Sequence, residues 1–114
     1  MLGIIFEVTP HPEHRDAYLD MAATLKPELE KIEGFISVER FQSLTTEGKM
    51  LSISFFENEK ALDDWRQLEA HRIAQKVGRE TYFKEYRLRV ASVIRDYGIA
   101  DRDEAPEDSK SRHG

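Results

Sequence analysis

The chain of 114 residues contains no cysteine. This absence excludes disulfide bonds, thiolate metal sites and cysteine nucleophiles. None of the other three histidines, His11, His14 and His113, stands at a metal-site spacing from His71, so we predict no metal. The dinucleotide fingerprint GxGxxG is also missing. The sequence thus offers no motif for a bound redox cofactor, and none is expected.

Long apolar runs and an excess of basic residues are lacking as well. The opening segment MLGIIFEV has no basic flank and is too short for a signal peptide or a membrane span. A formal net charge of -5 with no basic stripe disfavours nucleic acid as a partner. With 39% hydrophobic and 34% charged residues, the composition is typical of one soluble domain. A cytoplasmic location is the default expectation.

The first third of the chain changes from strand to helix periodicity. Residues 2–8 alternate in the manner of a strand, which proline is expected to end because it cannot donate to a sheet. Apolar residues then recur at helical spacing from Tyr18 to Ile32, and Gly34 stands at the helix C-cap position. Pro27 is expected to kink or restart this helix.

The remainder shows two further strands, a helix and a last strand. Residues 35–43 and 50–57 are predicted to form an antiparallel hairpin. Asn58 is a plausible N-cap for the helix that follows, and a shift of its apolar stripe predicts a bend or break near residues 67–70. Residues 86–97 are interpreted as the fourth strand.

The order β-α-β-β-α-β predicts an α+β, ferredoxin-like fold, with a four-stranded antiparallel sheet and both helices on one face. Residues 1–98 are assigned to this domain. Residues 99–114 form a polar C-terminal tail, which composition alone predicts to be flexible.

Both faces of the predicted sheet carry apolar residues. On the strand at 35–43, Phe35 and Phe41 would lie opposite Ile36 and Val38. On the strand at 50–57, Phe56 with the small Ser52 and Ser54 would lie opposite Leu51, Ile53 and Phe55. The last strand adds Leu88, Val90 and Ile94 on one side. Helices cover only one face, so we predict a homodimer joined through the other. The alternative is a monomer with scattered surface aromatics.

Several segments resemble the antibiotic biosynthesis monooxygenase (ABM) domain family. They are Glu33–Ile36, Glu39–Phe41, Lys49–Ser52, Phe56–Glu57 and Trp65–His71. The resemblance covers about residues 2–97. It implies a dimeric α+β barrel in which each protomer has a cavity between its sheet and its helices.

Members of this family include enzymes that oxidise phenols to quinones with oxygen alone, haem-degrading monooxygenases, and proteins without an established activity. The resemblance implies a cofactor-independent monooxygenase acting on a small aromatic, phenolic or hydroquinone-type substrate. A deprotonated phenol is electron-rich enough to reduce oxygen, so the protein need supply only desolvation, orientation and a base or anion stabiliser. The haem-degrading members have an asparagine on the first strand, and their histidine ligand lies further along the second helix from its tryptophan. Here the first strand carries Glu7 and no asparagine, and His71 follows Trp65 by only six residues, so haem is disfavoured.

The resemblance implies seven site residues. They are the catalytic candidates His71, Trp65 and Asn58, and the substrate-binding candidates Arg40, Arg79, Phe83 and Tyr86. Trp65 and Phe83 would hold an aromatic ring, His71 would act as base or hydrogen-bond partner, and Arg40 or Arg79 would stabilise an anion. Trp65 also fits a core position, and Asn58 fits a simple helix cap.

A non-catalytic ligand-binding or interaction module is the alternative function, because a fold does not decide function. An enclosed cavity that brings Trp65, His71 and an arginine together would favour an enzyme or a ligand binder. The segment from Arg95 to Ser109 is also similar to close members of the group. That similarity implies that Arg102, Pro106 and Asp108 dock on the dimer.

Overall fold

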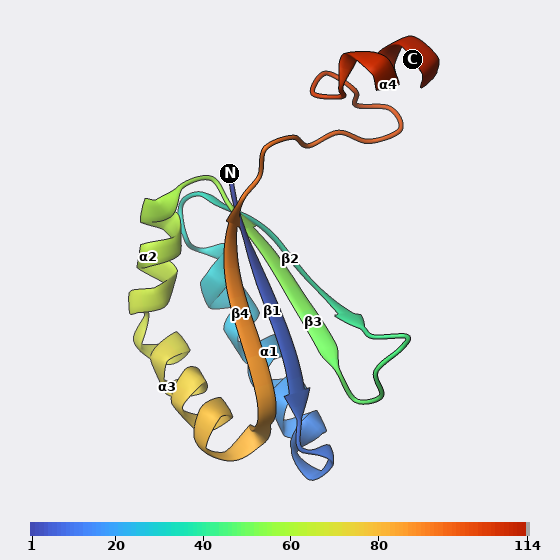
Figure 1. Cartoon of the computed structure of the whole chain (residues 1–114). Helices are drawn as coiled ribbons and strands as arrows, with labels where there is room; N and C mark the ends of the chain where they lie inside the picture. Colours follow the sequence, from blue (N-terminus) through green and yellow to red (C-terminus); the bar gives the residue numbers. More distant parts are fainter. Residues whose placement is uncertain (114) are drawn as a thin grey trace.

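The computed structural model describes residues 1–113, apart from the side chains of residues 69, 70 and 111–113. Four antiparallel strands form one sheet in the order β2-β3-β1-β4 (Figure 1). The strands are β1 (Leu2–Pro10), β2 (Phe35–Gln42), β3 (Met50–Phe56) and β4 (Phe83–Ser92). The helical elements are η1 (Pro12–His14), α1 (Arg15–Glu30), α2 (Glu59–Gln67), α3 (Glu69–Val77), the π-helical turn η2 (Gly78–Tyr82) and α4 (Glu107–His113).

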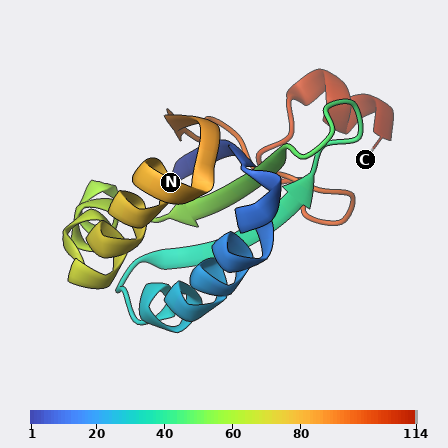
Figure 2. The same cartoon turned by 90° about the horizontal axis from the view of Figure 1, so that it is seen from below.

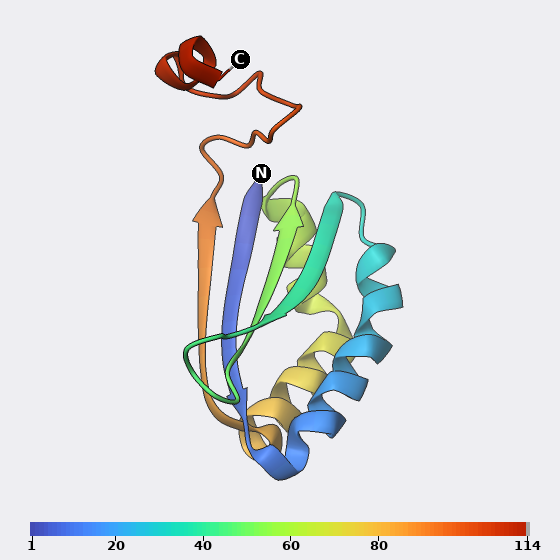
Figure 3. The same ribbon diagram turned by 90° about the vertical axis from the view of Figure 1, so that its right-hand side faces the viewer.

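Helices α1, α2 and α3 all lie on one face of the sheet, and the other face is open (Figures 2 and 3). This arrangement confirms the predicted ferredoxin-like fold. Helix α1 continues through Pro27 without interruption, so the predicted restart does not occur. None of the helices within the described residues is long and apolar enough to cross a membrane.

The helical segment after β3 is broken at a single residue. Leu68 has φ -61° and ψ 129°, an extended conformation between α2 and α3. Its backbone N–H still donates to the carbonyl of Trp65 at 3.2 Å. The predicted break near residues 67–70 is therefore confirmed, and α3 takes a new direction along the sheet (Figure 1).

A bulge in β2 changes the face on which Phe35 lies. Phe35 pairs with Phe56 and Ser37 pairs with Phe55, so Ile36 is an extra residue without a partner. Phe35 consequently packs against the core, with its ring centroid 5.9 Å from that of Phe56. The prediction that Phe35 and Phe41 share one face of the strand is wrong, because alternation along the strand is interrupted.

Strand β4 begins and ends earlier than predicted. It covers residues 83–92 instead of 86–97, and its pairing with β1 runs from Phe83 opposite Pro10 to Ser92 opposite Leu2. Beyond Ser92, the Val93 N–H still donates to the Met1 carbonyl at 3.0 Å, and the pairing with β4 ends there because β1 starts at Leu2. Ile94 therefore lies outside the sheet and is 83% exposed.

The buried core consists of two separate clusters along the helix-covered face. One contains Ile4, Leu29, Phe56, Ala61 and Leu62. The other contains Val8, Tyr18 and Met50. On β1 and β3, Phe6, Ser52 and Ser54 occupy the same face between these clusters, as their register shows. The core is thus divided into two parts, with smaller side chains between them on β3.

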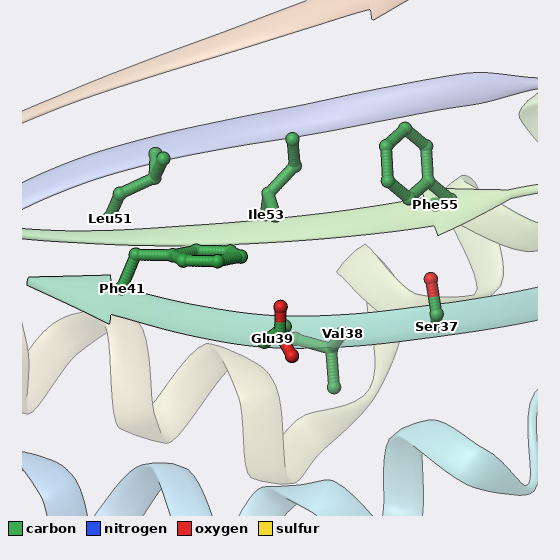
Figure 4. A pocket seen from close by; sticks show the side chains of 7 residues that line it. All are labelled: Ser37, Val38, Glu39, Phe41, Leu51, Ile53 and Phe55. Carbon is green, nitrogen blue, oxygen red and sulfur yellow. The ribbon is translucent and has the colours of Figure 1, made fainter. Parts of the chain in front are cut away.

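The open face of the sheet is apolar along β2 and β3, as predicted for these strands, whereas Glu7, Arg87 and Arg89 lie on it along β1 and β4. Figure 4 shows Phe41, Leu51, Ile53 and Phe55 on this face, with Glu39 and Ser37 beside them. Val38 points the other way. On this face, the carboxylate of Glu7 forms ion pairs with Arg89 at 2.7 Å and with Lys49 at 3.1 Å.

The tail leaves the end of β4 and is folded mainly on itself (Figure 1). Arg102 donates to the carbonyl of Gly98 at 3.3 Å and to the hydroxyl of Ser109 at 2.5 Å, and its guanidinium lies 5.5 Å from the centre of the Tyr97 ring. Ala105 is buried within this segment. These contacts hold Arg102 within its own tail, and docking of the tail on a second copy stays a prediction.

Candidate functional site

A cavity of about 560 Å³ lies between the sheet and the helices. Such a volume lies within the range of small-molecule sites. Six of the seven predicted site residues line it: Trp65, His71, Arg40, Arg79, Phe83 and Tyr86. Its other lining residues include Ile4, Phe6, Tyr18, Met21, Ala22, Leu25, Leu29, Val38, Ser52, Ser54, Leu62, Arg66, Ala74, Gln75, Leu88 and Val90.

The cavity exists because small residues occupy the middle of the helix-covered face. Ser52 lies between Phe6 of β1 and Arg40 of β2, and Ser54 lies between Ile4 and Val38. A large apolar residue at either serine would fill the space that joins the two core clusters. The serines were noticed in the sequence only as small members of a strand face.

The helix break brings Trp65 and His71 together. Residues six apart in one continuous helix are separated by about 240° around its axis and do not meet. With Leu68 extended between α2 and α3, the two rings instead stack, with centroids 4.2 Å apart and planes inclined by 26°. The six-residue spacing, which weakened the case for haem, therefore produces one paired unit on the cavity wall.

His71 is a neutral base in this position. Burial lowers its pKa from 6.5 to about 4, the charge of Arg66 lowers it further, and the nearby Trp65 backbone acts in the opposite direction. Nδ1 of His71 is buried and makes no hydrogen bond of ordinary geometry with any residue that the structure describes. A buried nitrogen without a partner is costly, so a ligand that hydrogen-bonds to this imidazole would satisfy an existing need.

Aromatic rings from β1, α1 and β4 surround Phe83 in the cavity wall. Its ring centroid lies 5.7 Å from that of Phe6, 5.4 Å from that of Tyr18 and 5.8 Å from that of Tyr86. Gly78 permits this placement, because a Cβ there would lie only 2.5 Å from the Phe83 ring. Phe83 and Tyr86 thus lie together in the cavity wall, and Phe6 and Tyr18 extend this aromatic surface.

Three arginines line the cavity from three different elements. Arg40 belongs to β2, Arg66 to the last turn of α2 and Arg79 to η2. Arg66 was missed by sequence reasoning, because the mixed charges around it are typical of a solvated helix face. Its position directly after Trp65 and before the predicted break was the available signal.

Asn58 lies elsewhere. Its side-chain oxygen accepts a hydrogen bond from the backbone N–H of Ala61 at 3.0 Å, as an N-cap of α2. It does not appear among the residues that line the cavity. The structure therefore does not bring Asn58 to the other six candidates, and the cap accounts for its type and position.

A second hollow lies on the open face between β2 and β3, with a volume of about 630 Å³ (Figure 4). Its walls are apolar apart from Ser37 and Glu39. Among its lining residues Glu39 is the one ionisable group and there is no histidine or cation, so acid-base chemistry is supported better by the helix-covered cavity. Within the described part of the chain, no group of three or more His, Cys, Asp or Glu side chains is arranged to hold a metal ion.

Comparisons with known proteins agree with the fold and the family resemblance. The family model described as antibiotic biosynthesis monooxygenase matches residues 1–77. The jasmonate monooxygenase ABM of Pyricularia oryzae is 44% identical over 93 residues, which are 82% of this chain and 43% of that protein. Bacillus subtilis YqjZ is 31% identical over 62 residues, 54% of this chain and 53% of YqjZ. The matched segments thus span about half of each relative.

Solved structures show the same fold at low sequence identity. Rv0793 from Mycobacterium tuberculosis has a TM-score of 0.76 at 15% identity, covering 85% of this chain and 98% of Rv0793. A crystal structure titled antibiotic biosynthesis monooxygenase has a TM-score of 0.71 at 16% identity, covering 82% of this chain and 99% of that one.

Proposed function

Because the chain belongs to the antibiotic biosynthesis monooxygenase family, we propose that it is a monooxygenase that needs no cofactor. Its substrate would be a small aromatic, phenolic or hydroquinone-type molecule bound in the cavity between sheet and helices. One observation carries this proposal: the stacked Trp65 and His71 share an apolar cavity of about 560 Å³ with arginines and an aromatic wall.

The cavity has a group for each task that the reaction requires. The substrate ring would lie between the Trp65 side and the Phe83 wall, where apolar side chains exclude water. His71, neutral above a pKa of about 4, would accept a hydrogen bond from the substrate hydroxyl. Such an imidazole is too weak a base to ionise a phenol alone. Arg40 or Arg79 would therefore stabilise the phenolate as the proton leaves.

The chemistry balances without an external reductant. A phenol that reacts with one molecule of oxygen gives a quinone and water. One oxygen atom enters the ring, while the other leaves as water with the hydroxyl hydrogen and the hydrogen of the attacked ring carbon. The substrate supplies all the electrons, so the protein's part is to orient the ring and stabilise its anion. Haem degradation is the less favoured possibility, because the first strand carries Glu7 and no asparagine and His71 follows Trp65 by only six residues.

The name of the Pyricularia oryzae relative adds jasmonate to the compounds worth testing. Because the match covers 43% of that protein, its activity is a candidate for this chain and no more. A non-catalytic ligand-binding role is the second candidate function, since the same cavity would hold a ligand without oxidising it.

A homodimer belongs to the same proposal. The open face carries Phe41, Leu51, Ile53 and Phe55 with no helix over them. A second copy placed on this face would remove an apolar patch from water and leave each helix-covered cavity intact. Sedimentation of the wild type against Ile53→Glu tests it: the wild type should sediment as a dimer and the variant as a monomer. A wild type that sediments as a monomer at high micromolar concentration would refute the dimer.

Oxygen uptake tests the reaction. Purified protein without added flavin, metal or haem would be assayed with a panel of phenols, hydroquinones and jasmonate, and compared with Trp65→Phe and His71→Ala. Uptake should require a ring substrate and fall in both variants. Oxygen uptake that neither change affects would refute the assignment of the reaction to this site. Ligand binding without uptake would favour the non-catalytic role, and a Soret shift dependent on His71 would revive haem.

A further inference from the structure

The cavity wall is positively charged although the chain as a whole is acidic. The formal net charge is -5. Yet Arg40, Arg66 and Arg79 all line the cavity, and no Asp or Glu stands among the described residues around it. Chance placement on an acidic protein would put carboxylates beside these arginines, so the imbalance points to a ligand with negative charge.

The three guanidinium groups are largely unneutralised. Among the described residues, Arg40 and Arg79 take part in no ion pair of 4 Å or less. Arg66 has one ion pair, with Asp63 at 3.8 Å, and both side chains of that pair are mostly exposed. An exposed pair of this length contributes little and is exchanged easily for a better partner.

All three arginines are exposed, whereas the interior lining is apolar. The arginines therefore belong to the part of the lining that reaches solvent, together with Tyr86, Leu88 and Val90. The walls of the cavity include the rings of Trp65, His71 and Phe83. A ligand that matches this division has an apolar ring that enters and an anionic group that stays at the opening.

We propose that Arg66, together with whichever of Arg40 and Arg79 does not stabilise the phenolate, forms an anion-binding rim that selects substrates carrying a carboxylate at the end remote from the reacting ring. This inference rests on the proposed function and specifies its substrate class. The planar guanidinium fork matches the two oxygens of a carboxylate. In this arrangement the rim fixes the orientation of the ring, so that its hydroxyl faces His71.

Trp65 supplies the measurement, because it is the only tryptophan in the chain and lies in the cavity wall. Quenching of its fluorescence would report binding without any need for turnover. The probes are 4-hydroxyphenylacetate and its neutral isostere 4-hydroxyphenylacetamide. Because a charge-assisted hydrogen bond contributes more than a neutral one, the acid should bind about 10-fold or more tightly than the amide. Raising the salt concentration should narrow that difference.

Variants of the rim separate charge from packing. Arg66→Gln should weaken binding of the acid by roughly 3- to 10-fold and leave the amide unchanged, because Arg66 has no assigned role at the ring hydroxyl. Arg40→Gln and Arg79→Gln should also weaken binding of the acid, and the one of the two that faces the ring hydroxyl should weaken both compounds alike. The matching lysine changes should keep part of the preference. Arg15→Gln is the control, because Arg15 pairs with its neighbour Asp16 and does not line the cavity. Circular dichroism would show that each variant is folded.

The outcomes distinguish the rim from the site itself. Equal affinity for acid and amide would overturn the anion-binding rim, while the cavity would still bind a ring as proposed. No quenching by either compound would overturn both. A preference for the acid that Arg15→Gln removes as strongly as the rim variants would also refute the rim, because only general surface charge would then be acting.

Discussion

The two faces of the sheet share the same strands but offer opposite environments. On β3, Ser52, Ser54 and Phe56 face the helices, while Leu51, Ile53 and Phe55 face away (Figure 4). The covered face therefore has the smaller side chains at its centre and encloses a cavity. The open face has the larger ones and no cover. Alternation along one strand thus supplies both a site and a candidate interface.

Polar groups divide between the faces in a related way. The covered face gathers a neutral histidine and three arginines around apolar walls. On the open face, Glu7 already has partners in Arg89 and Lys49. Among the described residues of the covered face, Arg40 and Arg79 form no ion pair, and the pair of Arg66 with Asp63 is long and exposed. A ligand is therefore better suited to that side, and a second protein surface to the other.

The largest expected difference between the faces is in stability. Phe56→Ala should lower the free energy of unfolding by about 3–5 kcal/mol, because Phe56 is fully buried in the core and its removal leaves a cavity. Phe41→Ala should cost far less at low protein concentration, since Phe41 is 45% exposed. Urea unfolding measures both.

Repeating the unfolding measurements at higher protein concentration tests whether a second copy covers the open face. If a second copy covers the open face, the cost of Phe41→Ala should grow as the protein is concentrated, whereas that of Phe56→Ala should stay about constant. Equal costs for the two changes at low concentration would contradict the contrast between the faces.

A second prediction places one change on each face. Ser52→Phe should fill the cavity and weaken ring-ligand binding about 100-fold, at a folding cost of about 1–3 kcal/mol from overpacking. Ser37→Phe makes the same change on the open face, where binding should stay at the wild-type level. Quenching of Trp65 fluorescence measures both. Binding that survives Ser52→Phe would move the site elsewhere.

The third prediction concerns pH. Folding lowers the pKa of His71 from 6.5 to about 4, so between these values the unfolded chain binds a proton that the folded chain does not. Stability should therefore fall as the pH drops from 6.5 towards 4, by up to about 1 kcal/mol per pH unit given the partial exposure of the ring. His71→Gln should flatten this dependence in unfolding curves. An unchanged slope would show that the imidazole titrates normally.

The smallest effect is expected at Asn58. Asn58→Ala should lower stability by about 1 kcal/mol, because it removes the cap on α2. The turnover number with any active substrate should not change, since the side chain does not line the cavity. Asn58→Ser, which retains a capping oxygen, should recover most of the stability. Loss of turnover in both variants would instead assign the amide to catalysis.

Local patterns predicted much of this fold. The alternation of apolar residues predicted the four strands and their order along the chain. The shift of the apolar stripe in the helix after the third strand predicted the break that lies at Leu68. The bulge at Ile36 and the early end of β4 were not predictable, because both depend on what the neighbouring strand offers for pairing.

The site was predictable in its residues but not in its geometry. Seven candidates were named and six of them line the cavity, yet the stack of Trp65 on His71 depends on how α3 turns after Leu68. Arg66 was overlooked because its charged neighbours indicated a solvated face. The cavity itself depends on the absence of bulk at Ser52 and Ser54, which becomes visible only when the core clusters on either side are assembled.

The most direct test of the account is oxygen uptake by the matched pair Ser52→Phe and Ser37→Phe, with whichever ring substrate is most active on the wild type. The account predicts that uptake is abolished when the helix-covered cavity is filled and stays at the wild-type rate when the open face is changed. Full uptake by Ser52→Phe, or uptake lost only in Ser37→Phe, would contradict the assignment of the reaction to the cavity.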